Sequence, residues 1–146
     1  MGSIRIRVAA LIRRGTSVLM IEHGKNNRCY WLLPGGGVEF GETLADALVR
    51  EMQEETNLQV KVGDLAFTSE TIDPRGQRHV LHMVFWADIV GGELRVGQEE
   101  RLKRVEFLEV STLSERVLHP PLAEHLQKLF SSDPPGCSHL GLLWSE

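Results

Sequence analysis

The chain has 146 residues, of which 42% are hydrophobic and 25% are charged, and its formal net charge is −4. This length and composition are typical of one globular domain, which can bury roughly two-thirds of its unfolded surface without disulfides or a structural metal. The negative charge argues against binding of nucleic acid or an anionic membrane by bulk electrostatics, and no apolar run approaches the length of a membrane span, so we expect neither as a partner.

The first half of the chain predicts three strands and a helix. Residues 4–13 alternate isoleucine and arginine before becoming apolar, which is typical of a strand, and Gly15 provides a turn into a second strand over residues 17–23. We expect these two strands to form a hairpin. A loop at residues 24–28 and a short strand over residues 30–33 precede three consecutive glycines and a helix that begins after Thr43.

The second half predicts strands over residues 65–72 and 79–90, on either side of a turn at residues 73–78. In the later strand, residues 81, 83, 85, 87 and 89 share one face, and residues 82, 84, 86 and 88 share the other. A polar loop at 91–103, a short strand at 104–110 and helical segments at 111–117 and 122–130 follow. This order predicts an α+β fold in which helices cover a mixed β-sheet on more than one face. We expect one domain over residues 1–130 and a tail over residues 131–146 that is either docked or disordered.

Cysteine content and the N-terminal segment indicate the compartment. Cys29 and Cys137 lie far apart, without the spacing of a disulfide framework or a zinc site, which favours a reduced compartment. Arg5 and Arg7 interrupt any signal-peptide apolar region, and Ile6 stands where a myristoylation signal needs Ser or Thr. We therefore expect a cytoplasmic protein.

The helix carries acidic residues where its own pattern predicts core. Its apolar residues, at helical spacing, are Leu44, Ala45, Leu48, Val49 and Met52. Glu55 points in nearly the same direction as Leu48, Glu51 lies at the edge of the apolar stripe, and Glu54 lies beside Glu51. These carboxylates repel one another, and near the C-terminal end the helix dipole disfavours each by about 0.3–1 kcal/mol.

A bound cation would remove these unfavourable interactions. Ligands that are all oxygen atoms select a hard ion such as Mg²⁺ or Mn²⁺ rather than zinc. The glycine run lets the backbone approach closely, so a carbonyl group there can complete the ion's coordination. The alternative is a solvated acidic end of a surface helix, and the helix alone does not decide between the two.

The glycine loop and the helix together resemble the signature of the Nudix family, G-x5-E-x7-R-E-U-x-E-E-x-G-U, in which U is a bulky aliphatic residue. Gly36, Glu42 and the segment 50–58 match every fixed position except one, because Asn57 stands where the family has glycine. That position follows the helix end and needs a left-handed backbone, which asparagine adopts most readily after glycine. The resemblance implies the Nudix fold, an α/β/α sandwich with a mixed β-sheet.

The resemblance also implies a metal-dependent hydrolase that cleaves a nucleoside diphosphate linked to another moiety, with water attacking a pyrophosphate phosphorus. Its cofactor would be Mg²⁺ or Mn²⁺, and its partner a small-molecule nucleotide. Glu51, Glu54 and Glu55 would be metal ligands, with the carbonyl of Gly35 as a further one. Arg50 would orient Glu51, and Gly36 and Glu42 would support the loop. The catalytic carboxylate is left open between Glu51 and Glu54 in the signature and Glu99 and Glu100 in the later loop, which are alternatively further metal ligands or solvated.

The substrate is less clearly indicated. Pro74 lies sixteen residues after Leu58, which resembles the ADP-ribose pyrophosphatase subgroup, although the sequence around Pro74 also forms a good turn in its own right. Candidate substrate contacts are Arg28, Arg75, Arg78 and Trp86, for which solvated charge or core packing are the alternatives. ADP-ribose or a related nucleotide sugar is favoured. The alternatives are a sanitising nucleoside triphosphate pyrophosphohydrolase and a nucleotide sensor without catalysis, and a homodimer is left open.

Overall fold

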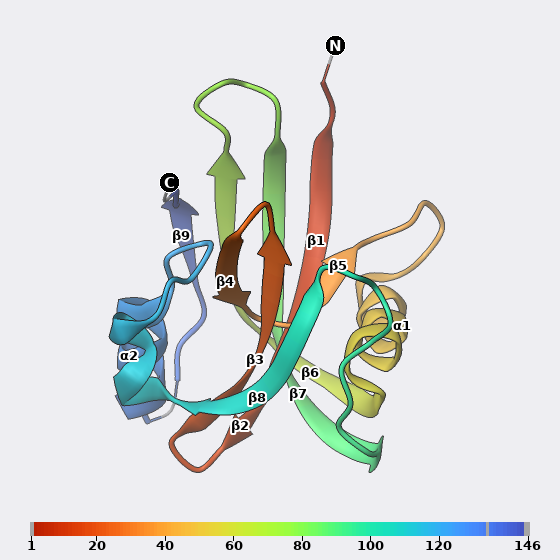
Figure 1. The fold of residues 1–146 in the computed structure, drawn as a ribbon. Coiled ribbons are helices and arrows are strands. Elements are labelled where there is room, and N and C mark those ends of the chain that lie inside the picture. The colour runs from red at the N-terminus through yellow and green to blue at the C-terminus, as the bar shows by residue number, and fades with distance from the viewer. Residues whose placement is uncertain (1, 134, 145–146) are drawn as a thin grey trace.

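Two β-sheets form the centre of the structure, a computed structural model that describes residues 2–133 and 135–144 (Figure 1). The first sheet has the strand order β5 (Gly35–Gly37), β1 (Ile4–Leu11), β7 (His79–Gly92), β6 (Leu58–Ile72) and β9 (Ser138–Leu142). The second contains β2 (Arg13–Arg14), β3 (Ser17–Lys25) and β4 (Arg28–Leu32), with β8 (Leu102–Glu109) paired to β3. The first sheet is mixed, because β1 runs parallel to β7 and antiparallel to β5.

Helices cover the sheets from opposite sides. Helix α1 (Leu44–Thr56) lies to the right in Figure 1, and helix α2 (Ala123–Ser131) lies to the left, next to the 3₁₀ helix η1 (Val110–Glu115). Successive residues of β1 face different helices: Val8 and Ala10 join the apolar cluster under α1, whereas Ala9 and Leu11 join the cluster under α2. The α+β fold and its α/β/α layering are therefore confirmed.

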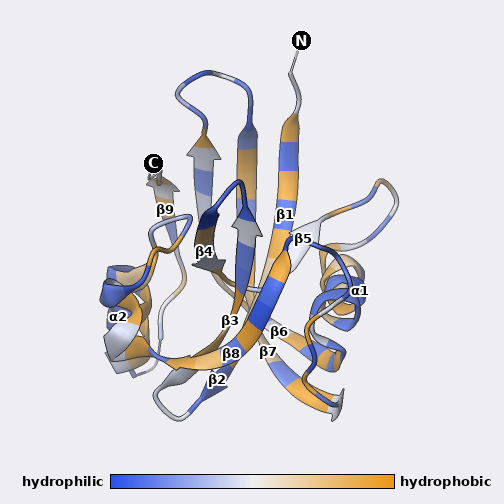
Figure 2. Ribbon diagram, in the orientation of Figure 1, coloured by the Kyte–Doolittle hydropathy of each residue, from blue (hydrophilic) through white to orange (hydrophobic). Residues whose placement is uncertain are grey.

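The first strand departs from the prediction. A single strand over residues 4–13 in a hairpin with residues 17–23 was expected, but β1 ends at Leu11 and pairs with β5 and β7, and only the two residues of β2 form the hairpin with β3. The reason is burial, because Val8 to Ile12 are all buried and a run that is apolar on both faces belongs to a central strand. Figure 2 shows the change along β1 from alternating hydrophilic and hydrophobic residues to this apolar end.

The later strands agree better with the sequence pattern. Met83, Phe85 and Ala87 of β7 pack on the α1 side, and Val84 and Trp86 pack on the α2 side, as their alternation predicts. Strand β6 begins at Leu58, earlier than expected, because irregular pairing between residues 59 and 67 lets it follow β7 along most of its length. The helical segment expected at 111–117 is a short 3₁₀ helix at 110–115.

Part of the predicted tail forms β9, which runs parallel to β6 at the edge of the first sheet. The hydroxyl of Thr68 lies 2.6 Å from Nδ1 of His139, across this pair of strands. Pro134, Ser145 and Glu146 of the tail lie outside the described residues. Neither helix within residues 2–133 and 135–144 combines the length and apolarity needed to span a bilayer. Cys29 and Cys137 are free and exposed.

Helix α1 has a defined cap at each end. The backbone N–H of Asp46 donates to the Thr43 hydroxyl over 3.0 Å, and Asn57 closes the helix with a φ of 61°. The side-chain amide of Asn57 also donates to the carbonyl of Glu93 over 2.8 Å. Asn57 therefore ends the helix and fastens the segment after β7 to it.

Replacing Asn57 by alanine is expected to lower the free energy of unfolding by about 2 kcal/mol, because alanine disfavours the left-handed backbone and loses the hydrogen bond to Glu93. Asn57→Gly loses only the side-chain hydrogen bonds, to Glu93 and from Gln53, and should be clearly more stable than the alanine variant. Urea denaturation of the three proteins measures the difference. Equal stability of the two variants would mean that the backbone conformation of Asn57 contributes nothing.

Candidate active site

Glu55 is the most deeply buried carboxylate of helix α1, with an exposed fraction of 0%. Its Oε1 accepts a hydrogen bond from the backbone N–H of Gly35 over 2.8 Å, whereas its Oε2 has no hydrogen-bond partner among the described residues. Nε2 of His23 and Nη2 of Arg101 each lie 3.9 Å from that oxygen. Burial raises the pKa of Glu55 to about 7, against the opposing effects of the Arg7 charge and the Gly35 N–H.

The buried face of α1 explains this position. The apolar stripe predicted from sequence included Ala45 and Val49, which are exposed, whereas Ala47 is buried together with Leu48 and Met52. The face is therefore rotated slightly toward Glu55, which continues it at the C-terminal end. The expected direction of Glu55 is confirmed, and two members of the stripe were wrong.

Glu51 lies against the glycine strand β5. A Cβ atom added to Gly36 would stand only 2.3 Å from Cδ of Glu51, so the carboxyl group occupies the space that a side chain at Gly36 would take. Burial raises the pKa of Glu51, although Arg50 acts in the opposite direction. Gly36 thus makes room for the carboxylate.

Gly36→Ala is expected to lower kcat/KM by ~10²-fold, because the new methyl group displaces the Glu51 carboxylate from its place over the strand. The melting temperature should change little, since the displaced atoms are the far end of a flexible side chain. Gly37→Ala is the matched control, because its added Cβ would meet only Nη2 of Arg5, at 3.1 Å. Loss of activity of similar size in the control would show that backbone freedom, not space for Glu51, is what the loop needs.

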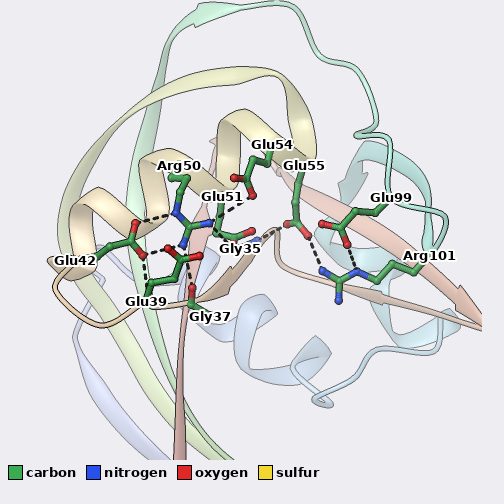
Figure 3. Close-up of polar contacts among 10 residues, drawn as sticks. All are labelled: Gly35, Gly37, Glu39, Glu42, Arg50, Glu51, Glu54, Glu55, Glu99 and Arg101. Atoms are coloured by element: carbon green, nitrogen blue, oxygen red, sulfur yellow. Dashed lines mark hydrogen bonds and ion pairs between the residues drawn. The ribbon is translucent and has the colours of Figure 1, made fainter.

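Arg50 links the acidic residues (Figure 3). Its Nε and Nη2 donate to the two carboxylate oxygens of Glu42, each over 2.8 Å, and its Nη1 donates to Glu51 over 2.9 Å and to Glu54 over 3.4 Å. The hydrogen bond from Arg50 lowers the pKa of Glu42 to about 2, and Glu42 also accepts the N–H of Glu39 over 2.9 Å. The arrangement holds the loop before α1 and fixes the side chain of Glu51.

The loop over residues 93–101 is fastened to the C-terminal end of α1. The N–H groups of Arg95 and Gly97 donate to the carbonyls of Thr56 and Glu55, over 3.0 and 2.8 Å. Glu99 and Arg101 are thereby brought to the acidic cluster, where they pair with each other over 2.8 Å. Glu99 therefore lies near Glu55 across Arg101 (Figure 3).

Two clefts adjoin this cluster. One, of about 310 Å³, lies between the start of β1, the glycine strand and the acidic helix, and its lining includes Arg7, Arg78, Glu51 and Arg101. The other, of about 770 Å³, lies between the β3–β4 hairpin and the loop over residues 93–101, and its lining includes Arg28, Glu99, Glu100 and Arg101. Arg101 lines both clefts.

Two of the residues proposed from sequence as substrate contacts, Arg78 and Arg28, therefore line one cleft each. The other two are placed elsewhere. Arg75 is exposed in the β6–β7 turn, with Nε 3.8 Å from Asp73. Trp86 stacks on Phe130 at a centroid distance of 6.1 Å, because its face of β7 is the one that α2 covers.

Sequence reasoning missed several residues of the smaller cleft. Arg5 and Arg7 both line it, and so do His23 and Arg101. A signal existed for the first two, because residues two apart on a strand share a face and β1 pairs with the glycine strand. No local signal marks His23 and Arg101. His23 lies on β3 where it pairs with β8, and Arg101 lies in the loop that is hydrogen-bonded to α1.

The fit of the site to a divalent cation follows from its donor atoms. Among the described residues, no three His, Cys, Asp or Glu side chains already surround a cation position. Arg50 engages Glu51 and Glu54, and Arg101 lies near Glu55. The donors are nevertheless all carboxylate oxygens on one side of α1, and the buried Oε2 of Glu55 lacks a partner. These residues fit a hard cation, which would take the place of arginine contacts.

Residues 3–131 match the model of the NUDIX domain, so the chain belongs to the Nudix family. Nudix hydrolases generally use divalent metal ions and act on small nucleotide substrates. The single departure from the family signature, Asn57, keeps the left-handed backbone that the signature glycine would supply.

Two relatives illustrate the range of the similarity. The chain is 41% identical over 112 residues to an ADP-ribose pyrophosphatase of Methanocaldococcus jannaschii, and the matched region covers 74% of this chain and 63% of that protein. It is 34% identical over 93 residues to the NAD-capped RNA hydrolase NudC of Pectobacterium atrosepticum, which covers 64% of this chain and 34% of that protein. The matched region thus spans less than two-thirds of either relative.

Solved structures show the same fold. A NUDIX hydrolase from Nitrosomonas europaea superposes with a TM-score of 0.76 at 19% identity, covering 86% of this chain and 87% of the other. An ADP-ribose pyrophosphatase from Streptococcus suis superposes with a TM-score of 0.70 at 21% identity, covering 92% and 98%. At these identities the comparison concerns architecture alone.

Proposed function

We propose that this protein hydrolyses a nucleoside diphosphate linked to another moiety, with Mg²⁺ or Mn²⁺ as cofactor and with water attacking a phosphorus of the pyrophosphate. The observation that carries the proposal is the buried Glu55 carboxylate, whose Oε2 has no hydrogen-bond partner within the described chain. It lies next to Glu51 and Glu54 on a helix that borders an arginine-lined cleft. A buried carboxylate oxygen without a partner is costly, and a cation would satisfy it.

In this proposal, Glu51, Glu54 and Glu55 hold the metal ion, together with the carbonyl of Gly35. A bound divalent ion would neutralise pyrophosphate charge, polarise the P–O bond and lower the pKa of a water molecule. Arg50, itself held by Glu42, positions Glu51, and Gly36 leaves space for it. These contacts support the roles assigned to the signature residues.

A carboxylate must also accept the proton of the attacking water. Glu51 and Glu54 are the candidates on α1, and Glu99 and Glu100 are the candidates on the later loop. Both loop candidates line the larger cleft, but Glu99 is also paired with Arg101, which lies beside Glu55, so Glu99 is the better placed of the two. A proton-accepting role for Glu99 requires that its contact with Arg101 open.

ADP-ribose or a related nucleotide sugar is the favoured substrate. The M. jannaschii relative is an ADP-ribose pyrophosphatase, and Pro74 follows the signature at the offset that resembles that subgroup. Arg78 and Arg28 are proposed to contact the phosphates or ribose from the two clefts. The proposal includes no nucleic-acid or membrane partner, and either a monomer or a homodimer is compatible with it.

The test is an assay of purified protein with Mg²⁺ or Mn²⁺ against ADP-ribose, other nucleotide sugars and damaged nucleoside triphosphates. We expect AMP and ribose 5-phosphate from ADP-ribose. A monophosphate and pyrophosphate from a triphosphate, without cleavage of ADP-ribose, would favour the sanitising enzyme instead. Tight binding of ADP-ribose without turnover at any metal concentration would contradict an enzymatic role.

A further inference from the structure

Arg7 is a cation in the wall of the smaller cleft that the residues around it do not neutralise. It lies on β1, opposite Gly37 of β5 and His82 of β7. Its Nη2 donates to the carbonyl of Leu33 over 2.9 Å, and no other hydrogen bond of its guanidinium occurs within residues 2–133 and 135–144. Most of its five N–H donors are therefore available to a ligand in the cleft.

Arg7 also lacks a close carboxylate. Glu55 and Glu51 attract its charge, yet no carboxylate oxygen of the described residues lies within 4.0 Å of the guanidinium, and burial lowers its pKa. The neighbouring histidines carry no charge. Burial in the first place, assisted by Arg7 and other arginines, lowers the pKa of both His23 and His82 to about 4, so both are neutral at pH 7.

The charges that line the cleft have a positive excess. Its cationic side chains are Arg5, Arg7, Arg78 and Arg101, and its acidic ones are Glu39 and Glu51. A half-buried cation that is not paired costs free energy, which an anionic ligand would recover. A guanidinium presents two parallel N–H donors that match the oxygen atoms of a phosphate group. The cleft therefore fits a phosphate ligand next to the acidic end of α1.

We propose that Arg7 binds the departing phosphate group of the substrate, in the cleft that borders the carboxylates of α1. This inference rests on the proposed function. In the reaction, the water oxygen bonds to one phosphorus, its proton passes to a carboxylate, and the bridging P–O bond breaks. The electron pair stays on the bridging oxygen of the departing phosphate, and the N–H donors of Arg7 stabilise that charge.

The first test measures anion binding without metal. Isothermal titration calorimetry with inorganic pyrophosphate in EDTA compares the wild type with Arg7→Met, Arg7→Lys and the control Arg75→Met, which removes an exposed arginine outside both clefts. We expect the wild type and the control to bind alike, and Arg7→Met to lose at least ~10-fold in affinity. Arg7→Lys should lie between, because lysine keeps the positive charge but lacks the two parallel N–H donors of a guanidinium. Absence of binding by the wild type, or unchanged binding by Arg7→Met, overturns the proposal.

The second test separates Arg7 from the metal site. Electron paramagnetic resonance of added Mn²⁺ should show equal or tighter binding in Arg7→Met, while kcat falls by ~10²-fold in the substrate assay and is partly restored in Arg7→Lys. Loss of Mn²⁺ binding in both Arg7 variants would make Arg7 a structural support of the acidic cluster and overturn the proposal. A wild type that binds pyrophosphate through Arg7 but cleaves no nucleotide would refute the proposed function and leave the anion site standing.

Discussion

Replacing Glu54 and Glu55 together by glutamine is expected to reduce kcat by ~10³-fold, because a bound metal ion contributes several kcal/mol of transition-state stabilisation and each 1.36 kcal/mol is tenfold in rate. The fold should survive. A glutamine at position 55 can still accept the hydrogen bond from the Gly35 N–H, and Glu54 is exposed over 53% of its side chain. The variant therefore tests the charges and not the packing.

Two measurements check this prediction. Turnover is followed on the substrate identified in the nucleotide panel, and the melting temperature is followed with increasing Mn²⁺. The ion should raise the melting temperature of the wild type and not that of the double variant, because an ion that binds only the folded state stabilises it. Asp46→Asn is the control, since Asp46 is an acidic residue of the same helix located at the opposite end. Unchanged turnover in the double variant would rule out the proposed site.

Gly35→Ala is expected to lower the free energy of unfolding by about 3 kcal/mol, at the upper end of the usual effect of overpacking. A Cβ atom at Gly35 would lie 2.0 Å from the carbonyl oxygen of Val8 and 2.7 Å from Cα of Ala9. Both atoms belong to the backbone of the central strand β1, which cannot move aside as a side chain can. The substitution should therefore separate β5 from β1 and also remove the Gly35 N–H from Glu55.

Gly36→Ala provides the comparison, because it adds the same methyl group one residue later. Denaturant titrations should show a large loss of stability for Gly35→Ala and a small one for Gly36→Ala, while activity falls in both. If the two variants are equally stable, the close approach of Gly35 to β1 does not constrain the loop. The adjacent glycines would then serve the same purpose, contrary to the contacts that each makes.

The sequence predicts the arrangement of the acidic cluster because the information for it is local. The helical period places Glu55 on the buried face, and a single helix and the loop before it carry Glu51, Glu54, Arg50 and Gly36. The structure brings these residues together as the spacing implies, with Arg50 between the carboxylates. Whether they bind metal stays a prediction.

The remaining parts of the site depend on pairing between distant segments, which periodicity does not encode. Arg101 reaches Glu55 because the loop that carries it is hydrogen-bonded to α1, and Arg7 reaches the cleft because β1 pairs with β5. The same limitation accounts for Trp86. The sequence predicted the face of β7 on which Trp86 lies, but not that helix α2 covers that face. The hairpin expected for residues 4–23 was wrong. The sequence shows that the end of β1 is apolar on both faces, but it does not show that β5 and β7 are the strands on either side of it.

Glu55 makes two separate contacts, which together connect the loop over residues 93–101 to the carboxylate cluster. Its carboxylate faces the site, while its main-chain carbonyl holds the N–H of Gly97, where an added Cβ would come within 2.3 Å of the carbonyl oxygen of Glu54. Outward movement of this loop would both withdraw Arg101 from Glu55 and leave carbonyl groups in the last turn of α1 without their hydrogen-bond donors. Amide hydrogen exchange at Gly97 would thus report on opening of the cleft, because exchange there requires the same local separation that exposes Glu55 to solvent.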